Sequence, residues 1–327
     1  MTEKLYRDTT HSEEYGYAYL SYVLAMDRIE DFGEMVKHFR LLNLDINAQV
    51  PFNGKTIVHQ LRDIYELSDV VGIHVGELIL KLPNIDLNIK DKNGNTPLLS
   101  FYLNGCVVAL KQNGGETGLP PLLEASCMYN LDEVKKLLNK DDIDINQTDE
   151  MGRTALHFAS YMGHTEIGKH LLLTDDIDVN KTCSVPDWND LVYELVYELG
   201  ECGLTPINIA AFYGHYEICE LLLSHPKLDS INKIDEIHGR TVLHYAVIGA
   251  SEKLVRLLLN YPNIDLRIVD RRDRTPWKYA WGQGATTLMK LLEERGGGSK
   301  GEFGIDAHSS EEERTTDDDD SDSDSSQ

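Results

Sequence analysis

Apolar and polar positions along this chain predict a repeated pair of short helices. In the clearest unit Thr154 precedes a helix whose apolar residues Leu156 and Ala159 share one face, and Gly163 ends that helix. A second amphipathic helix follows, with Leu171 on its apolar side. Signatures like Thr-Ala-Leu-His recur with spacings of 51, 36 and 34 residues, beginning at Thr154, Thr205, Thr241 and Thr275. A period near 34 residues predicts a stacked array of helical hairpins with an extended binding surface, rather than one globular core.

Polar turns separate the helical units, and their sequences also follow a recurring pattern. Residues 149–153 form a turn in which Gly152 supplies a positive φ, and residues 176–180 read Asp-Ile-Asp-Val-Asn. The order of turn, Thr-Pro-Leu-His-x-Ala helix, Gly-His break, Leu-Leu helix and Asp-Val-Asn exit resembles the ankyrin repeat. The resemblance implies an all-α ankyrin-repeat solenoid of stacked helix-turn-helix units with β-turn fingers, with about seven repeats including degenerate N-terminal ones.

Copies of the pattern weaken toward the N-terminus. Thr56 and Thr96 begin two weaker copies, and residues 15–42 are interpreted as an N-terminal capping pair of helices. Pro120 stands where Thr is usual, only 24 residues after Thr96. The second helix between these two positions must therefore be shortened.

The chain divides into three parts on this reading. Residues 1–14 are expected to form a flexible N-terminus, and residues 15–295 the array, strongest over 118–295. Residues 296–327 begin with Gly-Gly-Gly-Ser and then carry many acids, which predicts a disordered acidic tail. The tail is either simply solubilising or phosphorylated at hydroxyl groups with an acid three positions later, as in casein kinase 2-like sites: Ser309, Ser310, Thr315, Thr316 and Ser321.

One interval holds an insertion. The 51-residue spacing leaves about 17 extra residues, assigned to 184–200, and insertions in such arrays emerge on one face that is often the binding face. Its leucines recur at i, i+4 and i+8, at Leu191, Leu195 and Leu199. This spacing predicts a short amphipathic helix. Either the helix packs on the flank of the array, or it presents an exposed hydrophobic anchor made of Trp188, Tyr193 and Tyr197.

Charge narrows the class of partner. The 327-residue chain has a net charge of −24, and residues 301–327 alone carry eleven Asp or Glu and one Arg. Nucleic acid and anionic membranes need a basic footprint, so we expect neither, and a partly basic protein partner is favoured. Five scattered cysteines without a Cys-x-x-Cys pair, no apolar leader and no apolar stretch of about 18 residues predict a cytoplasmic monomer, with the nucleus also open to it.

Catalytic signatures are missing from the sequence. It contains no phosphate-binding loop, zinc-protease helix, nucleophile elbow or kinase set, so we expect no enzyme, no cofactor and no metal. His59, His157 and His244 share one slot of the repeat and could suggest metal ligation or acid–base work. In ankyrin repeats that slot is structural, and we expect buried imidazoles bonded to the neighbouring turn. A cysteine and a histidine that meet only in space remain an alternative.

Binding residues follow from the resemblance alone. In ankyrin arrays the finger tips and the inner face of the first helix line a concave groove. The corresponding positions here are Glu150, Met151, Arg153, Tyr161, Met162, Leu204, Phe212, Tyr213, Glu236, Arg240, Ile248, Arg271, Arg272 and Arg274, with Lys92, Asn93 and Asn95 upstream. The aromatic members could equally pack against the next repeat of the same chain. The basic finger tip at 271–274 could be simply solvated, bind an acidic partner or contact the acidic tail.

The function predicted from these features is a non-catalytic scaffold or adaptor that binds a protein in its concave face. The alternative is an inhibitor or effector that occludes a partner's active site with the 184–200 insert.

Overall fold

The computed structural model describes residues 84–101 except 93, 114–183 except 141, and 203–298, together with residues 47, 49, 54–56, 58 and 59. The helices of these segments alternate between two roles along the chain. The first helix of a repeat, called helix A, is α6 (Pro97–Phe101), α8 (Pro121–Cys127), α10 (Ala155–Met162), α13 (Pro206–Phe212), α15 (Val242–Ile248) or α17 (Pro276–Gly282). The second, called helix B, is α9 (Leu131–Leu138), α11 (Thr165–Leu172), α14 (Tyr216–Leu223), α16 (Glu252–Leu259) or α18 (Thr286–Glu294).

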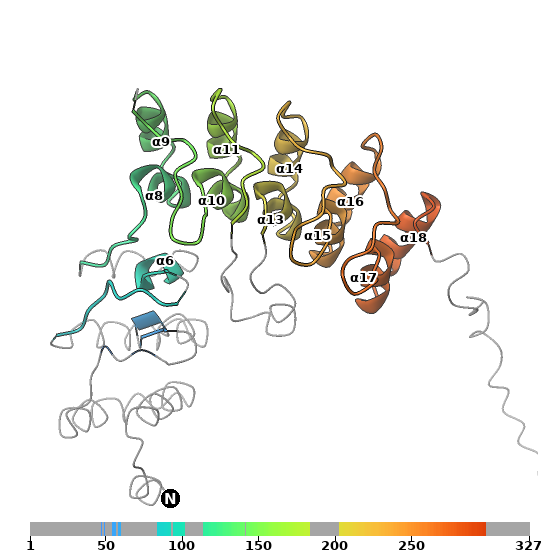
Figure 1. Ribbon diagram of the computed structural model, residues 1–327, viewed down its shortest axis with the longest axis horizontal. Helices are drawn as coiled ribbons and strands as arrows, with labels where there is room; N and C mark the ends of the chain where they lie inside the picture. The colour runs from blue at the N-terminus through green and yellow to red at the C-terminus, as the bar shows by residue number, and fades with distance from the viewer. Residues whose placement is uncertain are drawn as a thin grey trace, which may run out of the picture.

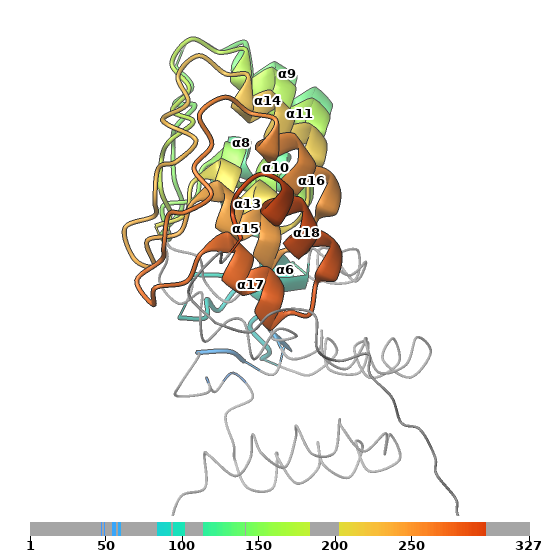
Figure 2. The ribbon, with the colours of Figure 1, turned by 90° about the vertical axis from the view of Figure 1, so that its right-hand side faces the viewer.

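The two kinds of helix form two stacked rows. Figure 1 shows the rows following an arc, with the A helices on its inner side. Figure 2 looks onto the C-terminal end of the stack, and the loops between repeats project to one side. The predicted all-α ankyrin array is therefore confirmed. The described residues contain five complete hairpins and α6, and the remaining N-terminal copies of the expected seven lie largely outside them.

Burial explains why the two rows differ in sequence. The helices α10, α13 and α15 each pack between two neighbouring A helices and on their own B helix, so residues 155–161 of α10 are all buried. A B helix is buried on one side only, and its other side faces water. In α16, Leu254, Val255 and Leu258 are buried, while Glu252 and Arg256 face water. Burial of such apolar side chains against a neighbouring repeat, at about 1.5–3 kcal/mol each, is what stabilises the stack.

The insertion begins and ends on a finger, the hairpin loop that precedes helix A. In the finger before α10, the Asp149 N–H donates to the Arg153 carbonyl at 3.1 Å. Cys183 and Leu204 form the equivalent pair as an isolated antiparallel bridge, with N···O distances of 2.9 and 3.1 Å. Residues 184–203 thus replace the short tip 150–152 of an ordinary finger. Positions 184–202 lie outside the described residues, including the predicted helix and its anchor residues Trp188, Tyr193 and Tyr197.

The repeat of α8 and α9 has almost no finger. Asp265, at the exit loop before α17, lies eleven positions before that helix, whereas the equivalent Glu116 lies only five before α8. Part of the shortening expected for the preceding second helix therefore falls in this finger. The rest concerns residues 102–113, which are not among those described.

Neighbouring fingers close over this gap. Lys90 Nζ lies 2.6 Å from Glu150 Oε1, and Arg153 Nη2 donates to Asn95 Oδ1 at 2.9 Å. These contacts connect fingers that are two repeats apart along the chain.

The predicted capping helices 15–42 and the tail beyond residue 298 also lie outside the described residues. Among the helices that are described, none combines the length and the apolar character needed to cross a membrane.

Candidate protein-binding surface

A histidine in helix A ties each repeat that carries it to the next. The Thr154 N–H donates to His157 Nδ1 at 3.0 Å, so this nitrogen carries no proton. The opposite nitrogen, Nε2, therefore carries the proton and donates to the Leu204 carbonyl at 3.2 Å. His157 thus caps its own helix and bonds to the finger of the following repeat.

The same geometry recurs at the other two histidines of this slot. His59 Nε2 donates to the Asn95 carbonyl at 3.0 Å, and His244 Nε2 to the Arg274 carbonyl at 3.1 Å. Burial lowers the pKa of His157 and of His244 to about 4, because a charged imidazolium would lose its hydration there. These imidazoles are neutral at pH 7, and the structural role predicted for the slot is confirmed.

Asparagines form a second ladder, which sequence reasoning missed. Asn146 at the exit of one repeat donates from Nδ2 to the Asp176 carbonyl at 2.7 Å and accepts the Asp178 N–H at 2.8 Å. Each of these side chains therefore satisfies both a donor and an acceptor of the next exit loop. The same two-bond bracket is made by Asn47, Asn88, Asn180 and Asn232. The signal was present in the recurring Asp-x-Asn exits.

Two arginines predicted to contact a partner are instead buried. Arg153 and Arg240 have only 3% and 1% of their surface exposed. Arg153 pairs with Asp149 and reaches Asn95, as described above. Arg240 Nε donates to the Tyr279 hydroxyl at 3.0 Å. Both guanidinium groups are bonded within the array and hold fingers in place.

Three predicted apolar contacts are buried as well. Tyr161, Leu204 and Ile248 are exposed by 7%, 4% and 4%. The ring of Tyr161 packs edge-on against that of Tyr213 in the next repeat, with centroids 4.6 Å apart. Leu204 lies in the bridge with Cys183. Tyr161 therefore pads the next repeat, which was the alternative interpretation for the aromatic members.

The finger tips do reach the surface. Glu150, Glu236, Arg271 and Arg272 are exposed, and Met151 is half-buried. Of the remaining predictions, Arg274 is half-buried and bonds through Nε to Asp270 Oδ2 at 3.1 Å. Upstream, Lys92 is exposed, Asn95 is buried, and Asn93 lies outside the described residues.

Aromatic and methionine side chains gather where the A helices end. Met162, Phe212 and Tyr213 are half-buried at the ends of α10 and α13, and the rings of Phe212 and Tyr213 meet edge-on at 5.0 Å. Tyr129 occupies the same turn after α8 with 54% of its surface exposed, and its ring lies 4.7 Å from that of His164. These four residues, Tyr129, Met162, Phe212 and Tyr213, are called the inner patch. It spans three successive repeats.

Tyr129 was missed because its backbone conformation is unusual. Its φ is 51°, in the left-handed region where the equivalent positions carry Gly163 and Gly214. A side chain there costs about 1 kcal/mol, and such strain often accompanies a functional position. Three exposed apolar residues of the fingers were also missed: Ile234, Ile237 and Val269.

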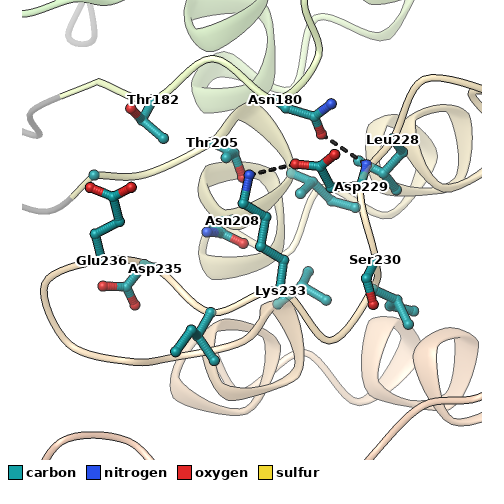
Figure 3. Close-up of a pocket in the computed structure, with 15 residues that line it drawn as sticks. Asn180, Thr182, Thr205, Asn208, Leu228, Asp229, Ser230, Lys233, Asp235 and Glu236 are labelled. Atoms are coloured by element: carbon teal, nitrogen blue, oxygen red, sulfur yellow. Dashed lines mark hydrogen bonds and ion pairs between the residues drawn. The ribbon is translucent and has the colours of Figure 1, made fainter.

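A small pocket lies between two neighbouring fingers. Figure 3 shows Thr182 and Thr205 on one side of it, Asp235 and Glu236 on another, and Lys233 paired with Asp229. Its volume is about 50 Å³. That space holds a few water molecules and is far below the 300–1,000 Å³ of typical small-molecule sites.

Comparison with known proteins agrees with this architecture. A family model described as ankyrin repeats in three copies matches residues 92–183 and 187–270. Rabankyrin-5 of Mus musculus is 35% identical over 78 residues, which are 24% of this chain and 6% of that protein. The I-Kappa-B like protein C2 of Microplitis demolitor bracovirus is 29% identical over 89 residues, 23% of this chain and 49% of its own length.

The NF-kappa-B inhibitor cactus of Drosophila melanogaster is 31% identical over 91 residues, 28% of this chain and 18% of that protein. The chain therefore spans less than half the length of each of these relatives. The family model, in contrast, matches more than half of the chain, and the matched residues include His157 and His244 of the first ladder and Asn146, Asn180 and Asn232 of the second. The chain belongs to the family of ankyrin repeat proteins.

Proposed function

We propose that this protein is a non-catalytic scaffold or adaptor that binds a partner protein along the inner side of its array. Ankyrin repeats are generally protein-binding modules. The observation that supports it most directly is the inner patch, in which three successive repeats each place an aromatic or methionine side chain at the end of helix A. Such side chains are enriched at the centres of protein interfaces.

The ladders support the proposal through pre-organisation. From the α8–α9 repeat to the α17–α18 repeat, histidine and asparagine side chains bond each repeat to the next, so the fingers and the inner patch keep their positions before a partner arrives. A surface that is already ordered loses less conformational entropy on binding than a flexible one. The fold therefore favours recognition of one folded surface or one extended peptide by shape.

Thiol chemistry is a poor fit to the described cysteines. Cys127 and Cys219 are buried as free thiols, and Cys183 is buried as well. Burial raises the pKa of Cys127 to about 12 and also raises the pKa of Cys219, because a thiolate would be desolvated. Neither is a nucleophile at neutral pH, which argues against an enzyme built on them. Buried free thiols also fit a reducing compartment, and we place the protein in the cytoplasm.

The test is affinity capture followed by binary binding measurements. The full chain and a Met162→Ser/Tyr213→Ser variant serve as baits, and recovered proteins are titrated against both by calorimetry. We expect the double variant to bind at least about tenfold more weakly, since loss of two interface anchors removes more than about 1.4 kcal/mol. Leu173→Ser is the matched control, because Leu173 is 81% exposed at the end of α11 in the outer row.

Thermal unfolding followed by circular dichroism checks that the variants remain folded. If the folded double variant keeps the parent's affinity for every recovered protein, the inner patch is not the binding surface and the proposal fails.

A second candidate function is inhibition by occlusion. Two relatives are named as an inhibitor or an I-Kappa-B like protein, and the Cys183–Leu204 bridge makes the insert an enlarged finger tip. An enlarged tip is placed to enter a cleft of a bound partner. The test replaces residues 184–203 with Glu-Met-Gly, the tip of the finger at 150–152. Loss of inhibition of a recovered enzyme with unchanged array stability supports the wedge, and unchanged inhibition rules it out.

A further inference from the structure

The last repeat leaves uncovered a face that is covered in the repeats before it. In α15, Leu243 and Val247 are 0% exposed, because the next repeat packs on them. The equivalent residues of α17 are Trp277 and Trp281, and Trp281 is 65% exposed. Figure 2 shows α17 and α18 nearest the viewer, at the free end of the stack. Trp277, Trp281 and the half-buried Met289 of α18 are called the terminal face.

A terminal repeat normally replaces covered apolar residues with polar ones. Glu293 follows this rule. It stands where α16 has the buried Leu259, and its Oε1 accepts the Trp277 indole N–H at 2.9 Å. Trp281 departs from the rule, because an indole of 150–250 Å² replaces a valine and faces outward. This contrast points to a segment that covers the indole.

The chain itself continues from this end. Gly297 is buried, its N–H donates to the Leu292 carbonyl at 2.8 Å, and a Cβ there would lie 3.0 Å from Leu266. The chain is therefore held on the last repeat up to this point. Phe303 and Ile305 follow six and eight positions later and are the only large apolar residues of the sequence from 299 to 327. An extended chain spans at most about 3.6 Å per residue, so both can reach the terminal face.

Two features of these residues match the terminal face. Positions i and i+2 of an extended segment point to the same side, so Phe303 and Ile305 can pack together on one surface. The two tryptophans are separated by one helical turn on α17 and also share one side of their helix.

Charge favours the tail over a second copy of the protein. Residues 270–298 carry six Lys or Arg against four Asp or Glu, whereas residues 149–182 carry three against six. The tail at 301–327 has eleven acids and one Arg. A tail that folds back brings opposite charges together. End-to-end pairing of two copies would bring two acidic tails together, which opposes that arrangement.

We propose that residues 301–313 fold back and cover the terminal face, with Phe303 and Ile305 packed on Trp281 and Trp277. The acids that follow then lie beside the basic side chains of the last repeat, such as Lys290. The segment completes the array as a non-helical cap. This inference does not depend on which partner the inner patch binds.

Tryptophan fluorescence tests the proposal in the full chain. Trp188→Phe leaves Trp277 and Trp281 as the only emitters, since the sequence has three tryptophans. In this background Phe303→Ser/Ile305→Ser is compared with the parent. We expect acrylamide to quench the variant about twofold more strongly and the emission to shift to longer wavelength, because an uncovered indole is open to solvent.

The matched control changes two tail residues outside the docking segment, Ser321→Ala/Ser323→Ala, and we expect parental quenching from it. Equal quenching of the parent and the Phe303→Ser/Ile305→Ser variant overturns the proposal. Quenching that falls with protein concentration, together with a dimer in light scattering, also overturns it, because a second copy then covers the face. The substitutions lie outside the described helices, and an unchanged helical circular dichroism spectrum verifies that the array is intact.

Discussion

The Nε2 hydrogen of His157 is donated to the Leu204 carbonyl, and this bond spans the position where the chain departs for its insertion. The two atoms are 3.2 Å apart, and Leu204 pairs in turn with Cys183. The base of the enlarged finger is therefore fixed to the inner helix of the preceding repeat. Residues 184–202 are therefore attached to a part of the array that hydrogen bonds hold in place.

His157→Ala should destabilise the protein by about 1–3 kcal/mol, because it leaves the buried Thr154 N–H without its acceptor and removes one of the two hydrogen bonds that the Leu204 carbonyl accepts. Urea unfolding followed by circular dichroism measures the change. His225→Ala is the control, since His225 makes only a 3.3 Å contact with the Lys227 N–H in a surface loop. Equal midpoints for the two variants would contradict the structural role of His157.

Stability should fall as the pH drops from 6.5 toward 4. The pKa of His157 and of His244 is lowered from 6.5 to about 4 in the folded protein. In this window the unfolded chain binds protons that the folded protein does not, so acid favours unfolding. Each histidine contributes a loss of up to about 3 kcal/mol between pH 7 and 4, at about 1.4 kcal/mol per pKa unit.

The matched variant for this pH dependence is His157→Asn/His244→Asn, because Asn208 occupies the same slot in the intervening repeat. It removes both titrating groups and should flatten the dependence of the urea midpoint on pH. Parallel loss of stability in the parent and the double variant would show that other groups dominate.

Much of the fold could be predicted because the residues that define each repeat lie close together in the sequence. Helix caps and helix breaks recur at fixed positions after Thr154, Thr205, Thr241 and Thr275, so each copy folds into the same pair of helices. The contact surface could not be predicted in the same way. Whether Arg153 faces water or the interior depends on Asn95, 58 positions away, and on the missing finger between them. Tyr129 was missed because it stands at a turn where the other copies usually have glycine.

Arg240 and Arg271 should respond differently to substitution, although both were predicted as contacts. Arg240→Met removes a guanidinium that is 1% exposed, donates to Tyr279 and lies 3.8 Å from Asp270. Breaking a buried charged contact of this kind costs about 3 kcal/mol. Arg271→Ala changes an exposed finger tip and should shift stability by less than about 0.5 kcal/mol. Thermal unfolding of the two variants measures the contrast, and similar losses would contradict the burial of Arg240.

Replacing Ala250 with glycine should stabilise the array. Ala250 has a φ of 52° in the turn between α15 and α16, where the repeats before it have Gly163 and Gly214. Removing the Cβ relieves left-handed strain of about 1 kcal/mol, and the greater freedom of the unfolded chain offsets part of it. The net gain should be a few tenths of a kcal/mol, within reach of replicate urea titrations.

The reciprocal change provides the control. Gly214→Ala introduces the same strain at a φ of 73°, while its new Cβ would lie 3.4 Å from Ser251, an ordinary contact. Because sterics at this site are mild, backbone strain dominates, and the variant should lose about 1 kcal/mol. Opposite signs for the two substitutions confirm that the turn requires a left-handed residue. A loss of stability in Ala250→Gly would show that the methyl group contributes packing that outweighs the strain.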